Sequence, residues 1–164
     1  MKLVFDPARG FDLALTSSGG IDPGIGNGGS LEAAVWVSVF TDLLAEAGEM
    51  SADLGSDRRG WWGDSGRERA GCMGSLLWLH MREKLNETGR RQIENAVRES
   101  LQWLIADGIV ADVAVSAVRL GRADARRGIE AGPADAVRLR IELTEPNGVR
   151  RDWKVDLLWS GVAG

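Results

Sequence analysis

Several residue types that build common functional sites are scarce in this chain, which has no tyrosine, one cysteine and one histidine. With Cys72 alone, an internal disulfide is excluded, and such sparing use of cysteine fits a reducing compartment. With His80 alone, the chain has no cluster of histidines and cysteines of the kind that holds a metal ion. We therefore expect neither a metal site nor a cofactor.

Long apolar runs and a strong excess of one charge are also missing. No run approaches the roughly 20 apolar residues of a membrane-spanning helix, and the N-terminus lacks the pattern of a signal peptide. The net charge of −4 is too small to indicate nucleic acid or an anionic membrane as a partner. These absences predict a soluble protein that is made in the cytoplasm and binds neither nucleic acid nor membrane.

What remains is the composition of a globular domain that is unusually rich in tryptophan. Of the 164 residues, 44% are hydrophobic and 27% are charged, which is enough for one domain over residues 1–164 with a real core. Seven tryptophans stand against three phenylalanines. Tryptophan is common in cores, and it also suits interfaces between proteins.

The first part of the chain predicts a hairpin followed by helices. Two short alternating runs with turn residues between them predict a β-hairpin within Met1–Leu15. Residues 16–29 are rich in glycine and read as a flexible connector. Helical spacing of apolar residues predicts helices over Leu31–Ala47, Leu76–Lys84 and Thr88–Asp107.

The last third of the chain predicts a sheet. Strands are expected over Ile109–Leu120, Ala134–Thr144 and Arg151–Trp159, and the last two are joined by a tight turn at Asn147-Gly148. A charged loop is expected at 121–133. Sequential strands with short connections form an antiparallel meander, and helices cover its apolar face. The fold class is therefore α+β: an N-terminal β-hairpin and two to three helices packed on a C-terminal antiparallel meander.

The stretch DRRGWWGD is the densest cluster of unusual residues, with two tryptophans and two arginines between aspartates and glycines. Adjacent residues cannot share one face of a strand or a helix, so the stretch predicts a loop whose indole rings point different ways. We expect one tryptophan to be buried and the other to be exposed at a partner contact, and one arginine to fix the loop while the other stays free. The alternative is a buried turn that only plugs the core. The candidate partner-binding residues are Asp57, Arg58, Arg59, Trp61, Trp62 and Asp64.

Four other patterns resemble chemical sites, and each lacks a component. Cys72 has arginines nearby but no histidine base beside it in the sequence. Asp64 and Glu68 are two carboxylates, but spacing in a loop does not set the separation that a glycosidase needs. The glycines at 24–28 lack the preceding strand and the Gly-Lys-Ser/Thr ending of a phosphate loop. Stacking of the Arg and Trp residues on single-stranded nucleic acid conflicts with the acidic total. We therefore expect no enzyme activity.

Seven landmarks occur in an order that resembles a known family, the baseplate wedge proteins of Mu-like contractile phage tails. They are the hairpin from Phe5 to Leu13, SLEAAVWVSVFTD (Ser30–Asp42), DRRGWWGD, GSLLWL (Gly74–Leu79), REKL (Arg82–Leu85), WLIADG (Trp103–Gly108) and DLLW (Asp156–Trp159). The resemblance covers nearly the whole chain. That branch is similar in turn to the W protein of P2-like phages, the sheath-initiating wedge subunit of T-even phages and the TssE subunit of type VI secretion.

The resemblance implies a structural role rather than a catalytic one. In that family, copies sit in a sixfold baseplate around the tail hub, contact other wedge proteins and seed the first ring of the tail sheath. The wider group carries a Gly-Glu-Arg-like run before Pro-x-x-Gly, and this chain lacks that Glu and Pro, so the roles known for that run are not transferred to its residues. The location implied is the virion baseplate after synthesis in the bacterial host cytoplasm, and we expect a monomer or weak dimer in isolation. Two other readings remain at this point: a lysozyme-like enzyme that acts on peptidoglycan, and a small regulatory protein-binding module of the same fold.

Overall fold

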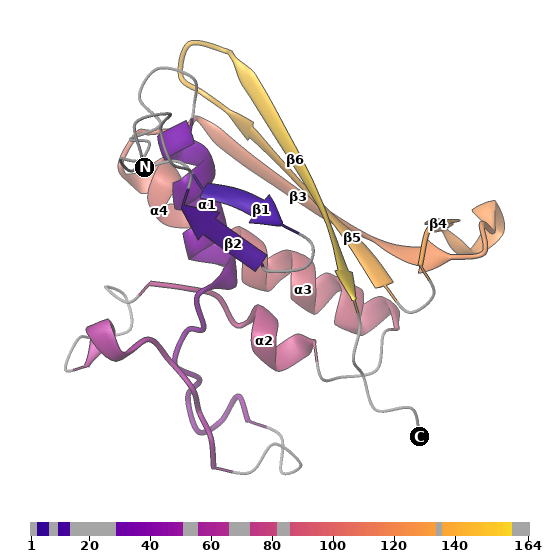
Figure 1. Ribbon diagram of the computed structural model, residues 1–164, viewed down its shortest axis with the longest axis horizontal. Helices are drawn as coiled ribbons and strands as arrows, with labels where there is room; N and C mark the ends of the chain where they lie inside the picture. The colour runs from indigo at the N-terminus through magenta and orange to yellow at the C-terminus, as the bar shows by residue number, and fades with distance from the viewer. Residues whose placement is uncertain are drawn as a thin grey trace.

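A four-stranded sheet, with helices packed on one face, forms the body of the protein (Figure 1). The computed structural model describes residues 3–6, 10–13, 29–50, 56–65, 73–81, 86–133 and 136–158. The sheet has the order β4-β3-β5-β6. Its strands are β3 (Asp112–Gly121), β4 (Ile129–Ala131), β5 (Ala136–Thr144) and β6 (Arg150–Leu158). Strands β3, β5 and β6 are consecutive antiparallel neighbours, so the predicted meander is confirmed.

The turn between β5 and β6 follows the predicted Asn-Gly chemistry with one difference. Gly148 has a φ of +84°, and its N–H donates to the carbonyl of Glu145. The N–H of Glu145 donates in turn to the carbonyl of Val149. Only Gly148 takes a positive φ here, which is typical of a three-residue hairpin loop that ends in a left-handed residue.

The predicted charged loop at 121–133 contains a fourth strand, which the sequence did not indicate. After a 3-10 turn, η4 (Ala125–Arg127), the short strand β4 pairs with the end of β3 in the parallel direction. Glu130 on β4 forms ion pairs with Arg138 and Arg140 of β5. These long-range ion pairs, together with the packing of Gly132 against Leu120, hold a segment whose own composition is that of a loop.

The helices are shorter and more broken than their periodicity predicts. They are α1 (Gly29–Phe40), α2 (Leu77–His80), α3 (Glu87–Ser100) and α4 (Gln102–Ala106). The expected continuation of the α2 helix at 82–85 lies outside the described residues. At the start of α2, the hydroxyl oxygen of Ser75 accepts the N–H of Leu77.

Helix α1 ends at Phe40, and the prediction that it continues to Ala47 is wrong. Beyond Thr41 the chain pairs with a distant segment instead. The N–H of Leu43 donates to the carbonyl of Ser75 at 3.0 Å, and the N–H of Ser75 donates to the carbonyl of Thr41 at 2.9 Å. These bonds between two segments of the chain replace the helical hydrogen bonds, so apolar spacing alone overestimates the length of the helix.

The predicted helix over Thr88–Asp107 is two helices, α3 and α4, that meet at Leu101. The side chain of Asn86 accepts the N–H of Gly89 and caps the start of α3. Leu101 breaks the regular helix, and it is fully buried, as is Leu104. Both leucines belong to the hydrophobic core. Gly108, with a φ of +69°, ends α4 at the predicted place.

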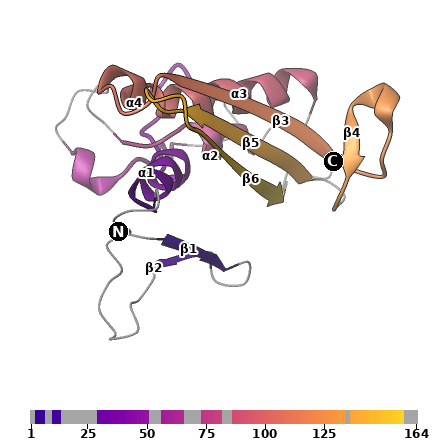
Figure 2. The ribbon, with the colours of Figure 1, turned by 90° about the horizontal axis from the view of Figure 1, so that it is seen from above.

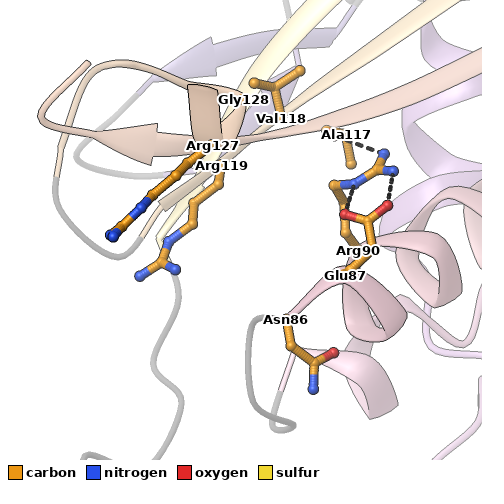
Figure 3. Close-up of a pocket in the computed structure, with 8 residues that line it drawn as sticks. All are labelled: Asn86, Glu87, Arg90, Ala117, Val118, Arg119, Arg127 and Gly128. Carbon is orange, nitrogen blue, oxygen red and sulfur yellow. Dashed lines mark hydrogen bonds and ion pairs between the residues drawn. The ribbon is translucent and has the colours of Figure 1, made fainter. Parts of the chain in front are cut away.

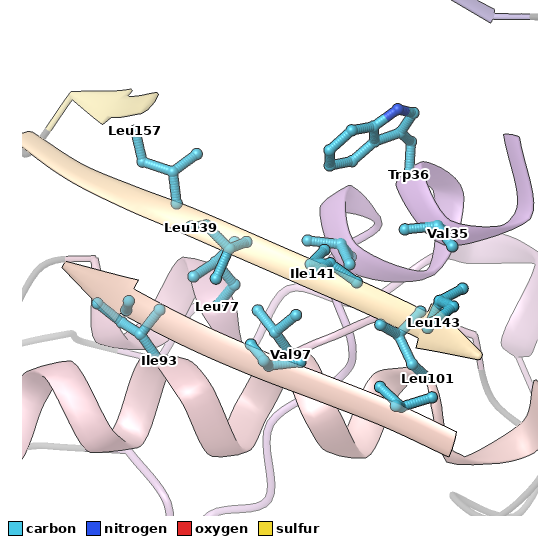
Figure 4. Close-up of a cluster of buried hydrophobic side chains, with 14 of the residues drawn as sticks. Val35, Trp36, Leu77, Ile93, Val97, Leu101, Leu139, Ile141, Leu143 and Leu157 are labelled. Carbon is cyan, nitrogen blue, oxygen red and sulfur yellow. The ribbon is translucent and has the colours of Figure 1, made fainter. Parts of the chain in front are cut away.

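The core lies between the helices and the inner face of the sheet (Figure 4). The odd-numbered residues of β5 are fully buried: Val137, Leu139, Ile141 and Leu143. They meet α1 through Val35 and α3 through Ile93 and Val97. Each such side chain contributes about 1.5–3 kcal/mol by leaving water. Apart from Ala136, which is buried, the even-numbered residues of β5 are exposed or half-buried and include two arginines, as the alternation predicts.

The N-terminal hairpin is also confirmed. Strands β1 (Leu3–Asp6) and β2 (Gly10–Leu13) pair antiparallel, and Phe5 lies opposite Phe11. The hairpin lies beside α1 and apart from the four-stranded sheet (Figure 2). The expected connector at 16–29 lies outside the described residues except for Gly29, which begins α1. In the part of the chain that the structure describes, no helix has the length and apolar character needed to cross a membrane.

Candidate functional site: an exposed tryptophan loop and an open sheet edge

The loop from Asp57 to Asp64 lies outside the layers of helix and sheet (Figures 1 and 2). It is irregular, as predicted, apart from one 3-10 turn, η2 (Trp62–Asp64). Two segments flank it: residues 41–45, which follow α1, and residues 73–75, which precede α2. The geometry of the loop follows from its bonds to these two segments.

Arg58 joins the loop to the first segment by a two-way contact. The N–H of Ala45 donates to the carbonyl of Arg58 at 3.1 Å, and Nε of Arg58 donates back to the carbonyl of Ala45. Ala45 itself is fully buried. The guanidinium thus serves as a brace for the backbone beneath the loop.

Arg59 is the centre of the loop's internal contacts. Its φ of +49° lies in the left-handed region, and the carboxylate of Asp57 accepts its N–H at 3.1 Å. The guanidinium forms an ion pair with Asp42 at 3.0 Å and lies over the ring of Trp78, 4.9 Å from the centroid. The indole N–H of Trp78 donates to the carbonyl of Leu43. One arginine therefore links the loop to the first flanking segment, through Asp42, and to helix α2, through Trp78.

Asp64 ties the other end of the loop to the second segment. Its Oδ2 accepts the N–H of Met73 at 2.9 Å. The next residue, Gly74, has a φ of +121°, and a Cβ there would lie 2.4 Å from the carbonyl oxygen of Thr41. The close approach of the two segments therefore requires glycine at this position.

Both tryptophans of the loop are exposed, so the prediction that one is buried is wrong. Trp61 is 39% exposed and Trp62 is 83% exposed. The rings do not diverge either, because their centroids lie 5.6 Å apart at an angle of 51°. Trp61 also lies against Gly63, where a Cβ would come within 2.4 Å of its ring. The two rings pack on each other and on the loop, since Trp78 occupies the buried position beneath.

The exposed indoles have apolar neighbours on both flanking segments. Leu44 is 45% exposed and Met73 is 41% exposed. Leu44 packs against Gly60 of the loop, and Met73 is joined to the loop because its N–H donates to Asp64. We call Leu44, Trp61, Trp62 and Met73 the apolar rim. A rim of this kind on a braced loop is typical of a contact surface between proteins.

The arginines behave differently from the prediction that one would stay free. Both bind the chain itself, Arg58 through Ala45 and Arg59 through Asp42 and Trp78. An arginine that fixes the loop was predicted, and the roles of Asp42 and Trp78 as its partners were not. Asp42 lay inside a helix predicted to run on to Ala47, so no signal in the sequence placed it beside Arg59.

A second surface feature is the free edge of the sheet at β6. Among the described residues, β6 pairs with β5 alone over nine positions. The N–H of Glu145 donates to the carbonyl of Val149, so these two residues form a hydrogen-bonded pair. In the register of β5 and β6, every second pair from this one is also hydrogen-bonded. The N–H groups of Arg151, Trp153 and Val155 therefore face β5, and those of Asp152 and Lys154 face away from the sheet.

The opposite edge of the sheet is covered along much of its length. Strand β4 covers β3 from Arg119 to Gly121. Beyond β4, side chains of α3 reach the edge of β3: Glu94 accepts the N–H of Ala117 at 2.8 Å, and Arg90 donates to its carbonyl at 3.2 Å. Among the described residues, the sheet therefore has one edge that is capped from Ala117 to Gly121 and one edge, at β6, without a neighbouring strand.

A hollow of about 470 Å³ lies between the start of α3 and the end of β3 (Figure 3). Its wall holds Arg90, which bonds to Glu87 and Glu94. The hydrogen bond from Arg90 lowers the pKa of Glu87, and the same bond raises the pKa of Arg90. The charges in this wall are thus already paired within the chain, and Figure 3 shows Arg119 and Arg127 on the other side.

The remaining candidates for chemistry do not form a site in the described part of the chain. There, no group of three His, Cys, Asp or Glu side chains is placed to hold a metal ion. His80 is the last residue of α2 and is half-buried, as expected for a boundary position. Cys72, Glu68 and the glycines at 24–28 lie outside the described residues.

Comparison with known proteins identifies the family. The model of the family described as phage protein GP46 matches residues 31–150. The chain belongs to the GP46 family. The match runs from α1 to the start of β6 and includes the tryptophan loop.

Two curated proteins named gp46 are similar to the chain over part of its length. The baseplate protein gp46 of Escherichia phage Mu is 41% identical over 91 residues, which are 56% of this chain and 61% of that protein. The Mu-like prophage FluMu protein gp46 of Haemophilus influenzae is 37% identical over 88 residues, 54% of this chain and 57% of that protein. The chain thus spans about three-fifths of the length of these relatives. No solved structure matches. The resemblance to proteins of Mu-like phages is confirmed.

Proposed function

We propose that this GP46 family member is a structural subunit of the baseplate of a Mu-like contractile phage tail. The exposure of Trp62 on a braced loop carries the proposal, because such a side chain contributes little to the isolated fold and much to a contact. The relative in phage Mu is named a baseplate protein, which supports the same role. The subunit is made in the host cytoplasm and is built into the virion.

The tryptophan loop is proposed as the contact with other proteins of the baseplate wedge and the tail hub. Arg58, Arg59, Asp57 and Asp64 hold the backbone of the loop, and the apolar rim makes the contact. Because the loop is already ordered, binding does not have to pay for ordering it. The sixfold arrangement belongs to the assembled baseplate, and the isolated subunit is a monomer or weak dimer.

A matched pair of variants tests this contact. Trp62→Ala should weaken co-purification with the neighbouring baseplate proteins by about 2 kcal/mol or more, which is about 30-fold in affinity. Ile109→Ala removes an apolar side chain of 42% exposure away from the loop and should bind normally. Both variants should melt near the wild-type temperature. Normal assembly by a folded Trp62→Ala protein would overturn the role of the loop.

The open edge of β6 is proposed as the place where a strand of the tail sheath is added to begin the first ring. An edge strand offers unpaired N–H and C=O groups that a strand from another chain can complete. The capped edge of β3 supports β6 as the site of addition.

The direction of the backbone groups on β6 allows a precise test. Lys154→Pro removes an N–H that faces away from β5, so the ladder to β5 is kept while an added strand loses a bond and meets the proline ring. Lys154→Ala keeps the N–H and is the control. Sheath attachment should fail with proline and persist with alanine. Attachment by both variants at equal strength would rule out β6.

The proposed role is structural, and no residue of the site is assigned to catalysis. Asp64 uses Oδ2 to hold the backbone at Met73, which is a positioning task. Purified protein should therefore not turn over peptidoglycan. Turnover that disappears in Asp64→Asn while the protein stays folded would contradict the proposal.

A further inference from the structure

The middle of the edge of β3, at Val115 and Ala117, is covered by a charged row along α3. The row consists of Arg90, Glu94 and Arg98, which are spaced four residues apart and therefore lie on one side of the helix. Glu94 accepts the N–H of Ala117, Arg90 donates to the carbonyl of Ala117, and Arg98 donates to the carbonyl of Val115 at 3.4 Å. We call these three residues the α3 row.

The bonds of the α3 row go to the same backbone groups that an added strand would need. Ala117 directs its N–H and its carbonyl away from β5, toward the helix. These groups are ordinarily the template for edge-to-edge pairing between sheets. Each bond involves a charged side chain, and such bonds are stronger than those between neutral groups. An incoming strand would have to displace them.

The row is anchored so that it keeps this position. Arg90 forms an ion pair with Glu94 and another with Glu87, at the first turn of α3. Arg98 is held by the preceding turn of the helix, because its guanidinium donates to the side-chain oxygen of Asn95 at 2.9 Å. Below the row, Ile93 and Val97 fix the helix in the core. The side chains are thus held over the edge by bonds on both sides.

A sheet with β3 and β6 both open would be complementary to itself. The β6 edge of one copy could pair with the β3 edge of the next, and that contact is head-to-tail. Contacts of that type do not close on themselves unless the rotation happens to form a ring, and they otherwise produce filaments. Long free edges in natural proteins are blocked for this reason.

We propose that the α3 row is a specificity device: it blocks strand addition at Val115 and Ala117 of β3 and so prevents head-to-tail pairing of copies of this chain, while β6 stays open to an added strand. The inference rests on the proposed function only in that β6 is open to an added strand. The excluded partner is a second copy of the same chain. The row therefore restricts strand addition to the β6 side of the sheet.

The test is the oligomeric state of the full chain. In Arg90→Ala/Glu94→Ala, both bonds to Ala117 are lost, and alanine favours helix, so α3 should remain formed. The mass of this double variant by light scattering should rise above that of the 17.7 kDa monomer as concentration increases, whereas the mass of the wild type should not. Arg91→Ala on the same helix, 70% exposed and away from the edge, is the matched control and should behave as wild type.

Two further variants separate edge pairing from misfolding. Lys154→Pro added to the double variant blocks the β6 side of the contact and should restore the monomer, whereas aggregation of a misfolded chain would persist. Glu94→Gln keeps an oxygen that accepts from Ala117 and should associate less than Glu94→Ala. A double variant that stays monomeric with normal far-UV circular dichroism, or association that Lys154→Pro leaves unchanged, would overturn the proposal.

Sheath attachment is measured separately on the same proteins. If Lys154→Pro restores the monomer but does not affect sheath attachment, the α3 row stands and the proposed role of β6 with the sheath fails. If Lys154→Pro abolishes sheath attachment but the double variant never associates, the role of β6 with the sheath stands and the proposal for the α3 row fails. The two ideas therefore fail by different observations.

Discussion

Within the tryptophan loop, neighbouring residues divide the work of holding and of presenting. Arg59 takes a left-handed backbone conformation that is uncommon for a residue with a side chain, and three contacts with Asp57, Asp42 and Trp78 keep it there. Trp62, three positions later, is almost fully in solvent. The cost of the strained residue is offset by contacts that a relaxed loop would lack.

Truncation of two tryptophans should distinguish the holding role from the presenting role. Trp78 is buried, accepts the guanidinium of Arg59 on its ring and bonds to the carbonyl of Leu43, so Trp78→Ala should lower the free energy of unfolding by about 3–5 kcal/mol. Trp62→Ala should change it by less than about 0.5 kcal/mol. Chemical denaturation of both variants measures the difference, and equal losses would mean that Trp62 belongs to the core of the protein in solution.

Gly74 should tolerate substitution less than another glycine of positive φ. At Gly74, alanine meets both an unfavourable φ and the carbonyl oxygen of Thr41, so we expect a loss of about 2 kcal/mol or more. Gly108 has a φ of +69° with open space around it, and alanine there should cost about 1 kcal/mol. Thermal unfolding of the two variants checks the order, which would be reversed if the 41–45 and 73–75 segments could move apart freely.

The sequence identified the loop as a candidate surface but not the contacts that shape it. Two adjacent tryptophans between glycines do indicate an irregular segment, and that part is confirmed. The partner of Arg59 is Asp42, 17 positions away, and the brace of Arg58 is the carbonyl of Ala45. Such pairs depend on how the chain crosses itself, which local patterning does not encode. The prediction that one of Trp61 and Trp62 is buried was wrong for the same reason.

At the scale of elements, alternation was the most reliable signal. Strands β3, β5 and β6 lie where apolar and polar residues alternate, because one face meets the helices and the other meets water. Strand β4 has three residues and no such pattern, and its place depends on ion pairs with Arg138 and Arg140. The helix lengths were overestimated at Phe40 and at Ser100, where tertiary contacts end the regular structure.

Two leucines of the sheet should show how the burial of a residue sets its contribution to the free energy of unfolding. Leu139 on β5 is fully buried, and Leu139→Ala should cost about 2–5 kcal/mol through lost transfer energy and the cavity left behind. Leu158 at the end of β6 is 70% exposed, and Leu158→Ala should change stability by less than about 0.5 kcal/mol. Denaturant titration measures both. A large loss at Leu158 would indicate that residues beyond β6 pack on it.

For the molecule as a whole, stability should fall in acid. Hydrogen bonds from Arg90, Arg151 and Arg138 lower the pKa values of Glu87, Glu145 and Asp156, respectively, below their ordinary values of 4.5, 4.5 and 3.8. A carboxyl group whose pKa is lower in the folded state stabilises the fold above its unfolded pKa, and this stabilisation is lost as the pH falls through the folded pKa. The melting temperature should therefore hold above about pH 5 and decline below about pH 4.5.

Removing one of the responsible arginines checks the origin of this decline. Arg138→Gln takes away the main cause of the shift at Asp156, so the acid part of the profile should become shallower. Arg150→Gln, at an exposed position on β6, serves as the control and should leave the profile as in the wild type. Profiles of identical slope for wild type and Arg138→Gln would show that this pair does not contribute.

The three segments beneath the apolar rim have a mechanical consequence. The bonds Ala45–Arg58, Asp42–Arg59, Thr41–Ser75 and Asp64–Met73 join the segments side by side, so they share a load in parallel rather than in series. A pull on Trp62 would therefore be transmitted to the end of α1 and to the start of α2 at once. The stiffness of this surface comes from bonds between chain segments and not from helix or strand, so we expect a force applied at the rim to reach the helical layer as well as the loop.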